Sequence, residues 1–274
     1  MRNFKRVILT VTSAALIVSG SFSAFAAATG TSTVQQSNYT AEQLISNAKL
    51  KFSSIDKYSF DQIVKSNLTT TVASENVDDI STSHFEFDGN KSHSVTMSNS
   101  NGINKITEIY YVKDGNTLHE YTITDGIISK NDTAYNTISD PRYQAFPIVY
   151  HGNETVTTTD TEYIVTGFLL GTDMTDSMIT SSVSFEDELA SYLLSTIFSP
   201  NLLMPYECRF DKATGNLTSM YINMTSLIEG LYSLFGFTAQ DAGVTSMELS
   251  TLMSDINYDD NTSIVVPASV LAAN

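Results

Sequence analysis

The side chains that most often carry chemistry are few and scattered in this 274-residue chain. Its four histidines are His84, His93, His119 and His151. No two of them show the H-x-x-x-H or H-E-x-x-H spacing that places two imidazoles on one metal ion. The single cysteine, Cys208, has no second thiol in the chain with which to form a disulfide. A transition-metal centre is therefore not predicted, and Cys208 is expected to be a buried, inert thiol.

Nucleophilic and carboxylate chemistry is also poorly supported. The S-x-x-K pattern occurs at 46–49 and 54–57, but G-x-S-x-G and K-T-G elements are absent. Asp255, Asp259 and Asp260 are candidate calcium ligands, although the EF-hand loop pattern is missing. No phosphate-binding glycine loop is present. We expect no enzymatic activity and no cofactor, and a hydrolase would require a Ser or Asp to meet a histidine in a cleft.

The first 26 residues carry a processing signal. Three basic residues precede a short apolar run, which is followed by the A-x-A cleavage pattern at Ala24–Ala26. The run is interrupted by hydroxyl residues and is shorter than the roughly 18 residues of a membrane span. No cysteine for lipid attachment stands at the junction. We therefore predict a secreted or extracytoplasmic protein with a cleaved signal peptide at 1–26 and no stable transmembrane anchor.

The expected mature chain is strongly acidic. Cleavage removes three of the 14 Lys and Arg residues and none of the 30 Asp and Glu residues, which leaves a net charge of −19. This charge repels phosphate backbones and anionic lipid head groups, so no nucleic-acid partner is expected. Residues 27–38 are small and polar and predict a flexible leader. Residues 39–274 are long enough to form a single domain without a disulfide.

An amphipathic helix is predicted at the start of this domain. Thr40 and Gln43 match a T-x-x-Q capping box. The apolar residues of the segment recur with helical spacing, which predicts one face that packs against another element. These residues are Ala41, Leu44, Ile45, Ala48, Phe52 and Ile55.

The segment from 58 to about 173 is rich in Thr, Ser, Tyr, Val and Ile and predicts a meander of antiparallel strands. A turn on Asp114-Gly115 should pair Val112 with Thr117 and Tyr110 with His119, and Asp125-Gly126 offers a second turn. The predicted strands span 58–73, 80–88, 92–99, 104–113, 117–124, 127–130 and 154–170. A loop is expected at 138–153.

The remaining chain alternates between helical and strand patterns. Helices are predicted over 184–200, 225–237 and 244–256, a hairpin over 206–224, and a last strand over 256–267. In the hairpin, Cys208 and Phe210 alternate with charged residues. The predicted fold is α+β, with a large curved antiparallel sheet and helices that cover its concave face.

Soft apolar residues are concentrated late in the chain. Seven of the nine methionines fall between residues 174 and 253. Methionine adapts to irregular space and to variable partners. Two interpretations remain open, because periodicity does not distinguish them: a cavity between helices and sheet that accepts an apolar ligand, and an ordinary core.

The order of elements resembles the LolA/LppX-like superfamily of bacterial envelope lipid carriers. The features that carry this resemblance are the signal peptide, the first amphipathic helix, K-Y-S-F at 57–60, F-D-K-x-T-G at 210–215 and I-x-x-P at 264–267. The resemblance covers about residues 39–271 and its motifs are short. It implies an unclosed half-barrel whose concave face holds an apolar ligand beneath helices, although a fold alone does not assign a ligand.

The leading hypothesis is a non-enzymatic extracytoplasmic binding protein for a lipid or other hydrophobic molecule. The alternative is a cell-envelope interaction or sensing module without a cavity, with an unidentified protein partner. We predict that the following residues line the ligand site: Phe60, Tyr110, Val112, Tyr121, Ile123, Cys208, Phe210, Met220, Ile222, Met224, Leu231, Leu234 and Phe235.

Overall fold

A computed structural model of the chain describes residues 39–73, 76–135, 146–173, 201–234, 236–258 and 263–273. Within these residues the helices with both ends described are α2 (Ala41–Phe52), α5 (Thr225–Leu234) and α6 (Ala268–Leu271), and residues 171–173 are also helical. The strands are β1 (Lys57–Thr70), β2 (Val77–Asp88), β3 (Lys91–Ser100), β4 (Ile103–Asp114), β5 (Thr117–Thr124), β6 (Ile127–Ala134), β7 (Thr155–Thr158), β8 (Glu162–Leu170), β9 (Leu203–Asp211), β10 (Leu217–Asn223) and β11 (Val244–Asn257).

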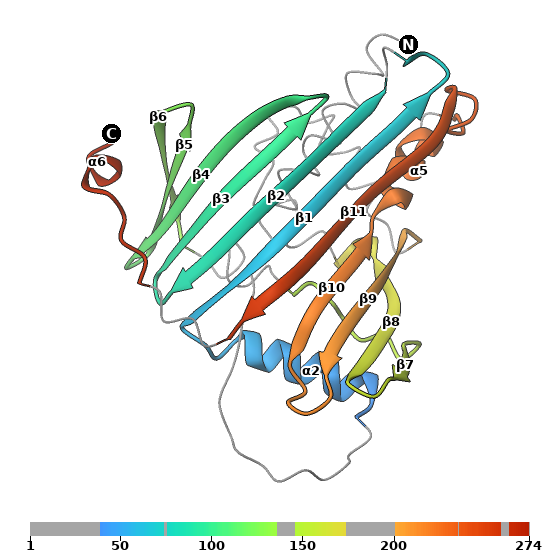
Figure 1. The fold of residues 1–274 in the computed structure, drawn as a ribbon, viewed down its shortest axis with the longest axis horizontal. Coiled ribbons are helices and arrows are strands. Elements are labelled where there is room, and N and C mark those ends of the chain that lie inside the picture. The colour runs from blue at the N-terminus through green and yellow to red at the C-terminus, as the bar shows by residue number, and fades with distance from the viewer. Residues whose placement is uncertain are drawn as a thin grey trace.

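All strands of the described residues form one sheet in the order β6-β5-β4-β3-β2-β1-β11-β10-β9-β8-β7 (Figure 1). Every neighbouring pair is antiparallel. The long strands β1 and β11 lie side by side and join the meander β1–β6 to the strands β7–β10. The strands β6 and β7 are the two ends of this order, so the sheet is not closed. The prediction of one large, unclosed antiparallel sheet is confirmed.

Helix α2 begins as the sequence predicts. Thr40 Oγ1 accepts a hydrogen bond from Gln43 N at 3.2 Å, and Gln43 Oε1 accepts one from Thr40 N at 3.0 Å, which completes the capping box. The apolar stripe of α2 is buried against the sheet. Phe52 at its end stacks on Phe146, with ring centroids 5.4 Å apart.

The first hairpin turn differs from the prediction. Asp114 pairs with Thr117, so Val112 lies opposite His119 and Tyr110 lies opposite Tyr121. The turn is therefore on 115–116, one residue later than predicted. The partners move by two residues, and an even shift keeps each side chain on its predicted face. The second turn falls on Asp125-Gly126, as predicted, between the paired residues Thr124 and Ile127.

The largest error concerns residues 244–256, which form β11 rather than a helix. The segment fills the central position between β1 and β10, where its backbone pairs on both sides. Its apolar residues fit helical and strand spacing alike, so the available pairing partners decide the outcome. The last strand predicted over 256–267 is wrong for residues 263–267, which have no regular structure and lead into α6. Residues 256–257 belong to β11, and residues 259–262 lie outside the described part of the chain.

Two smaller differences concern segment boundaries. The strand predicted over 154–170 is two strands, β7 and β8, which a turn at Thr159 separates. The loop predicted over 138–153 is irregular where it is described, at 146–153. The helix predicted over 184–200 lies outside the described residues.

The helices of the described residues are few. Residues of α2 and α5 belong to the main hydrophobic cluster of the sheet, whereas α6 packs elsewhere, with Val270 in a second cluster. A cover of helices over the whole concave face therefore stays a prediction. None of the helices in the described ranges is long and apolar enough to cross a membrane.

Candidate functional site

The two faces of the sheet carry different parts of the predicted ligand site. Paired residues of neighbouring strands point to the same face. Phe60 pairs with Phe85, Phe85 with Ser94, and Ser94 with Ile109. We call this the inner face, because it also carries the main hydrophobic cluster and packs against α2. Residues next to these in sequence point to the opposite, outer face.

Four predicted lining residues lie on the outer face and are therefore wrong as members of one shared site. They are Tyr110, Val112, Tyr121 and Ile123, which belong to a second hydrophobic cluster with Ile264 and Val270. The sequence prediction that these four side chains share one face, which was made from side-chain alternation along the strands, is correct. The register across β1 to β4 decides that this face is not the face of Phe60.

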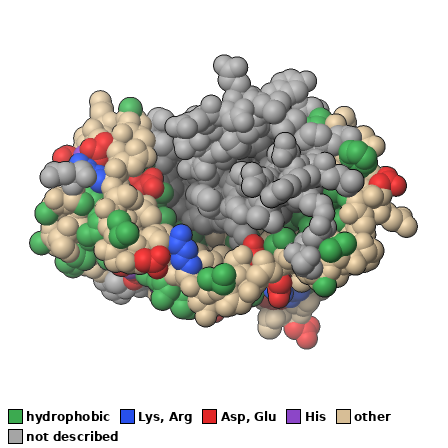
Figure 2. Space-filling view, turned by 90° about the horizontal axis from the view of Figure 1, so that it is seen from above, with side chains coloured by type: hydrophobic (Ala, Val, Ile, Leu, Met, Phe, Trp, Pro, Cys, Tyr) green, Lys and Arg blue, Asp and Glu red, His purple; other side chains and the backbone are tan. Residues whose placement is uncertain are grey.

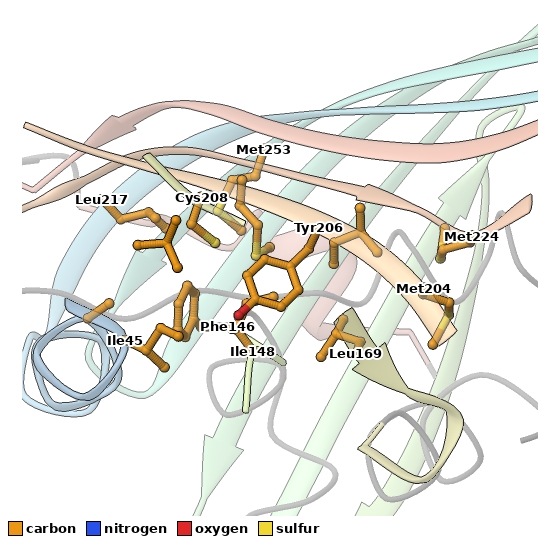
Figure 3. Packing of buried hydrophobic residues seen from close by; sticks show 14 of the residues in the cluster. Ile45, Phe146, Ile148, Leu169, Met204, Tyr206, Cys208, Leu217, Met224 and Met253 are labelled. Atoms are coloured by element: carbon orange, nitrogen blue, oxygen red, sulfur yellow. The ribbon is translucent and has the colours of Figure 1, made fainter. Parts of the chain in front are cut away.

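The other described lining residues do come together on the inner face. Phe60, Cys208, Phe210, Met220, Ile222 and Met224 are buried in one cluster, and Leu234 packs against it. The side chain of Leu231 and the whole of Phe235 lie outside the described part of the structure. We call the buried inner-face surface of β1 and β8–β11 the apolar region; Figure 3 shows part of its packing.

Several members of the apolar region were not among the predicted lining residues. They are Tyr163, Leu169, Met204, Tyr206, Leu217 and Met253. Phe146 and Ile148, from the preceding irregular segment, pack in the same hydrophobic cluster. The alternation of β9 already placed Tyr206 on the face of Cys208. Phe146 and Ile148 had no periodic signal, because their segment is not a strand or a helix.

Tyr206 depends on a glycine of the neighbouring strand. Gly167 is its direct partner on β8, and a Cβ atom at Gly167 would lie 2.8 Å from the Tyr206 hydroxyl oxygen. The missing side chain therefore gives the Tyr206 ring its space. Burial raises the pKa of Tyr206 above its ordinary value.

Cys208 has the environment of a structural thiol. It is fully buried between Val165 and Met220, its partners on the two neighbouring strands. Burial raises the pKa of the Cys208 thiol far above its ordinary value, so the nucleophilic thiolate is disfavoured.

Across β2–β5 the inner face is mixed: Phe85 and Phe87 of β2 still belong to the main hydrophobic cluster, but Ser and Thr side chains become frequent, above all on β3. We call this part the hydroxyl region; its members are Ser81, Ser83, Ser92, Ser94, Thr96, Ser98, Thr107, Thr122 and Thr124. Some satisfy each other across strands: Ser83 Oγ and Thr96 Oγ1 are 2.8 Å apart. The inner face of a single sheet thus changes from apolar to hydroxyl-bearing.

Three polar groups lie where the two regions meet, and we call them the boundary groups. Gln62 and Ser66 on β1 are each 1% exposed, and Asp79 on β2 pairs directly with Ser66. Gln62 Nε2 donates to Thr251 Oγ1 at 3.1 Å. Gln62 Oε1, Ser66 Oγ and Asp79 Oδ1 are buried without a hydrogen-bond partner in the described parts of the chain.

The hydroxyl region also contains a buried acid. Glu120 lies on the inner face of β5, opposite Tyr111, and it accepts hydrogen bonds from Tyr111 and, at 3.3 Å, from Thr122 Oγ1. Burial raises the pKa of Glu120 above its ordinary value, although these two hydrogen bonds oppose the shift. Burial also raises the pKa of Tyr111.

Histidines lie beside carboxylates, and three of them are on the outer face. His93 contacts Glu86 at 2.7 Å and Glu108 at 3.0 Å, and its ring stacks on that of Tyr110, whose hydroxyl donates to Glu108. The other contacts are His84 with Asp61, His119 with Asp132, and His151 with Asp173. No group of three or more His, Cys, Asp or Glu side chains in the described ranges is arranged to hold a metal ion.

The segment 263–273 covers part of the outer face. Lys91 Nζ donates to Ile264 O at 2.9 Å, and Ile264 N donates to Asp88 Oδ2 at 3.1 Å. These two bonds fix the segment beside the side chains of Tyr110 and Tyr121, where Ile264 and Val270 are buried. The outer-face cluster is therefore a local docking site for this chain's own C-terminal segment.

The surface around these regions is mixed. In the view of Figure 2, the described residues form a curved wall on which hydrophobic side chains are dispersed among polar and acidic ones. One exposed apolar pair stands on the outer face: Met97 and Ile106 are direct partners, and each is 58% exposed.

Comparisons with known proteins leave the family open. No protein-family model matches the sequence, and a search of curated proteins found no match. The interpretation of the site therefore depends on the residues themselves.

Proposed function

We propose that this protein is an exported, non-enzymatic binding protein for a lipid or another amphiphilic molecule, which lies against the inner face of the open sheet. The proposal keeps the predicted cleavage of residues 1–26 and the extracytoplasmic location. The resemblance to envelope lipid carriers, stated from short motifs, agrees with it.

The observation that carries the proposal is the change of chemistry along the inner face. From β8 to β1 the inward side chains are predominantly apolar, whereas from β2 to β5 about half are Ser or Thr, and those of β3 from Ser92 to Ser100 all are. A molecule with an apolar chain and a polar head matches this order, because each part then meets a surface of its own kind. A core that only stabilises the fold has no need of a buried serine row.

The energetics favour an apolar chain as the anchor. Each Å² of apolar surface removed from water contributes about 25 cal/mol, whereas polar contacts chiefly orient a ligand. Met204, Met220 and Met253 are buried in the apolar region, and methionine side chains adapt to chains of different shape.

The first test is native mass spectrometry of the protein recovered from an exporting bacterial host. We expect a species that carries lipid, and an intact mass that shows loss of the first 26 residues. Protein that is lipid-free and also fails to take up an added lipid or apolar dye would contradict the binding function.

A pair of adjacent substitutions localises the ligand. Ser83 points to the inner face and Thr82 to the outer face of β2. Ser83→Phe should reduce lipid uptake because its ring occupies the inner surface, whereas Thr82→Phe adds the same ring outside and should not. Thermal unfolding of both variants checks that each is folded. Equal uptake by both folded variants would place the ligand elsewhere.

The alternative function, an interaction or sensing module, is favoured by the exposed pair Met97 and Ile106. Scattered exposed apolar residues are common on protein surfaces, so this pair carries less weight than the two-part inner face. Lipid-free protein in which Met97→Ser removes binding to envelope proteins would favour this alternative.

A further inference from the structure

We infer that the ligand's head group is uncharged and rich in hydroxyl donors, as in an acylglycerol or a glycolipid, and that the boundary groups Gln62, Ser66 and Asp79 bind it. This inference rests on the proposed binding function and specifies its ligand class. Its basis is the unsatisfied hydrogen-bonding capacity of these three neighbouring groups of β1 and β2.

Buried polar groups in folded proteins nearly always have partners, since an unsatisfied group costs about 1–3 kcal/mol. The hydroxyl region shows the ordinary solution, in which Ser83 and Thr96 satisfy each other at 2.8 Å. The boundary groups depart from it. Gln62 uses one end of its amide for Thr251 and leaves the other without a partner in the described residues.

Buried polar atoms without a hydrogen-bond partner in the described residues are also found farther along β1 and on its neighbour β2. Ser66 follows Gln62 by four residues on the same face, and its direct partner on β2 is Asp79. Neither Ser66 Oγ nor Asp79 Oδ1 has a partner among the residues that the structure describes. Four residues of a strand span about 13 Å. Groups spread over this length suit a head with several hydroxyls better than a head with a single donor.

The kind of atom that is unsatisfied selects the chemistry of the head group. A carboxylate oxygen and an amide oxygen only accept hydrogen bonds, so their ligand must donate. Hydroxyls can donate to Asp79 and Gln62 and can also accept from Ser66. A fatty acid or a phosphate head group offers mainly acceptors and would add a negative charge beside Asp79.

The charge of the surroundings points the same way. The expected mature chain has a net charge of −19. Lys105 lies on the inner face, but it is exposed on β4, three strands from Gln62, which corresponds to about 14 Å. An exposed cation at this distance is largely screened by salt. Anionic head groups are therefore disfavoured at the boundary groups.

The test uses three lipids with the same lauroyl chain: monolauroylglycerol, lauric acid and methyl laurate. Their affinities for the full mature protein are measured by isothermal titration calorimetry. We expect monolauroylglycerol to bind about tenfold more tightly than the other two, because one good buried hydrogen bond corresponds to roughly that factor.

Two variants assign this preference to the boundary groups. Gln62→Met keeps the length of the side chain and removes its polar end, and Ser66→Ala removes one hydroxyl with little change in volume. Because a glycerol head group is shorter than the span of about 13 Å between Gln62 and Ser66, at least one of the two variants should weaken monolauroylglycerol binding several-fold, and both should leave methyl laurate binding unchanged. Gln240→Met, which changes an exposed glutamine, is the control and should bind like the wild type. Thermal unfolding confirms that each variant is folded.

The outcomes separate the two claims. If the wild type binds none of the three lipids, the proposed binding function fails. If it binds all three equally, or if folded Gln62→Met and Ser66→Ala keep the full preference, the binding function stands and the inference about the head group is wrong. Tighter binding of lauric acid would also overturn the inference.

Discussion

The strands β8–β11 bury their apolar side chains on the inner face, whereas the hairpin β4–β5 buries its tyrosines Tyr110 and Tyr121 on the outer face. In β9, Met204, Tyr206 and Cys208 point inward and are at most 3% exposed, while Arg209 on the outer face pairs with Glu162 at 3.0 Å. In β4 and β5 the outer face also buries aromatic rings, although Leu118 of β5 is still buried on the inner face. Tyr110 and Tyr121 are buried on the outer face beneath Ile264, and the inner positions of the neighbouring strand β3 are serines and Thr96.

This contrast shows what each cluster does. The inner cluster joins α2, α5 and six strands, so it ties together segments that are far apart in the chain. The outer cluster joins two neighbouring strands to one short C-terminal segment. We expect the first to determine global stability, and the second to determine only local order. The proposed function assigns the Ser- and Thr-bearing inner face of β3 to a ligand head group.

The largest effect is expected for Phe210→Ala in the inner cluster. Phe210 is fully buried between Tyr163 and Leu217, so truncation should lower the free energy of unfolding by about 3–5 kcal/mol. Phe168→Ala, at a 42% exposed position of β8, is the control and should cost much less. Chemical denaturation measures both variants. Equal losses would mean that the inner cluster does not dominate stability.

A smaller effect is expected for Ile264→Ala in the outer cluster. The C-terminal segment can leave the face without unfolding the sheet, so we expect a loss of about 1–2 kcal/mol. Hydrogen exchange should quicken in 263–273 and β4–β5 only. Val265→Ala, at a 79% exposed position, is the control. Faster exchange throughout β8–β11 would show that both clusters unfold as one unit.

The smallest effect concerns the buried acid of the polar inner face. Because burial raises the pKa of Glu120, the folded state holds its proton more tightly than the unfolded state. Its contribution therefore favours folding below the ordinary pKa of 4.5 and is lost as pH rises through the higher folded pKa. Glu120→Gln should remove this loss and keep an acceptor for Tyr111.

Thermal unfolding between about pH 4 and pH 8 measures the effect of Glu120. The stability of Glu120→Gln should fall less over this range than that of the wild type. Glu229→Gln, which removes the same charge from an exposed position of α5, is the control. Parallel pH profiles for the wild type and Glu120→Gln would show that the Glu120 carboxyl is well solvated.

Local signals in the sequence predicted the local structure well. The capping box of Thr40 and Gln43, the turn at Asp125-Gly126 and the alternation of β9 and β10 all depend on residues close in the chain. The helix predicted over residues 244–256 was wrong, because the apolar spacing of this segment fits a helix as well as a strand. The segment forms β11 because it pairs with β1 on one side and β10 on the other, and these two partners come together only in the assembled sheet.

The candidate site shows the same limit. The sequence placed Cys208, Phe210, Met220 and Ile222 on one face, and the structure joins them in one cluster. It also grouped Tyr110 with Tyr121, but it could not show that their face is opposite to that of Phe60. The unpaired oxygens of Gln62 and Ser66 had no signal at all, since hydrogen-bond satisfaction depends on neighbours from distant strands.

The sequence by itself determined the acidic charge, the alternation within each strand and the cap of the first helix, because these depend on composition or on residues a few positions apart. Only the tertiary structure decided which face of each strand is covered, which strands are neighbours, and where polar groups meet apolar ones. The physical reason is that the side chains of a strand point alternately to its two faces, and the local sequence allows either face to be buried. Only packing against distant segments decides which face that is.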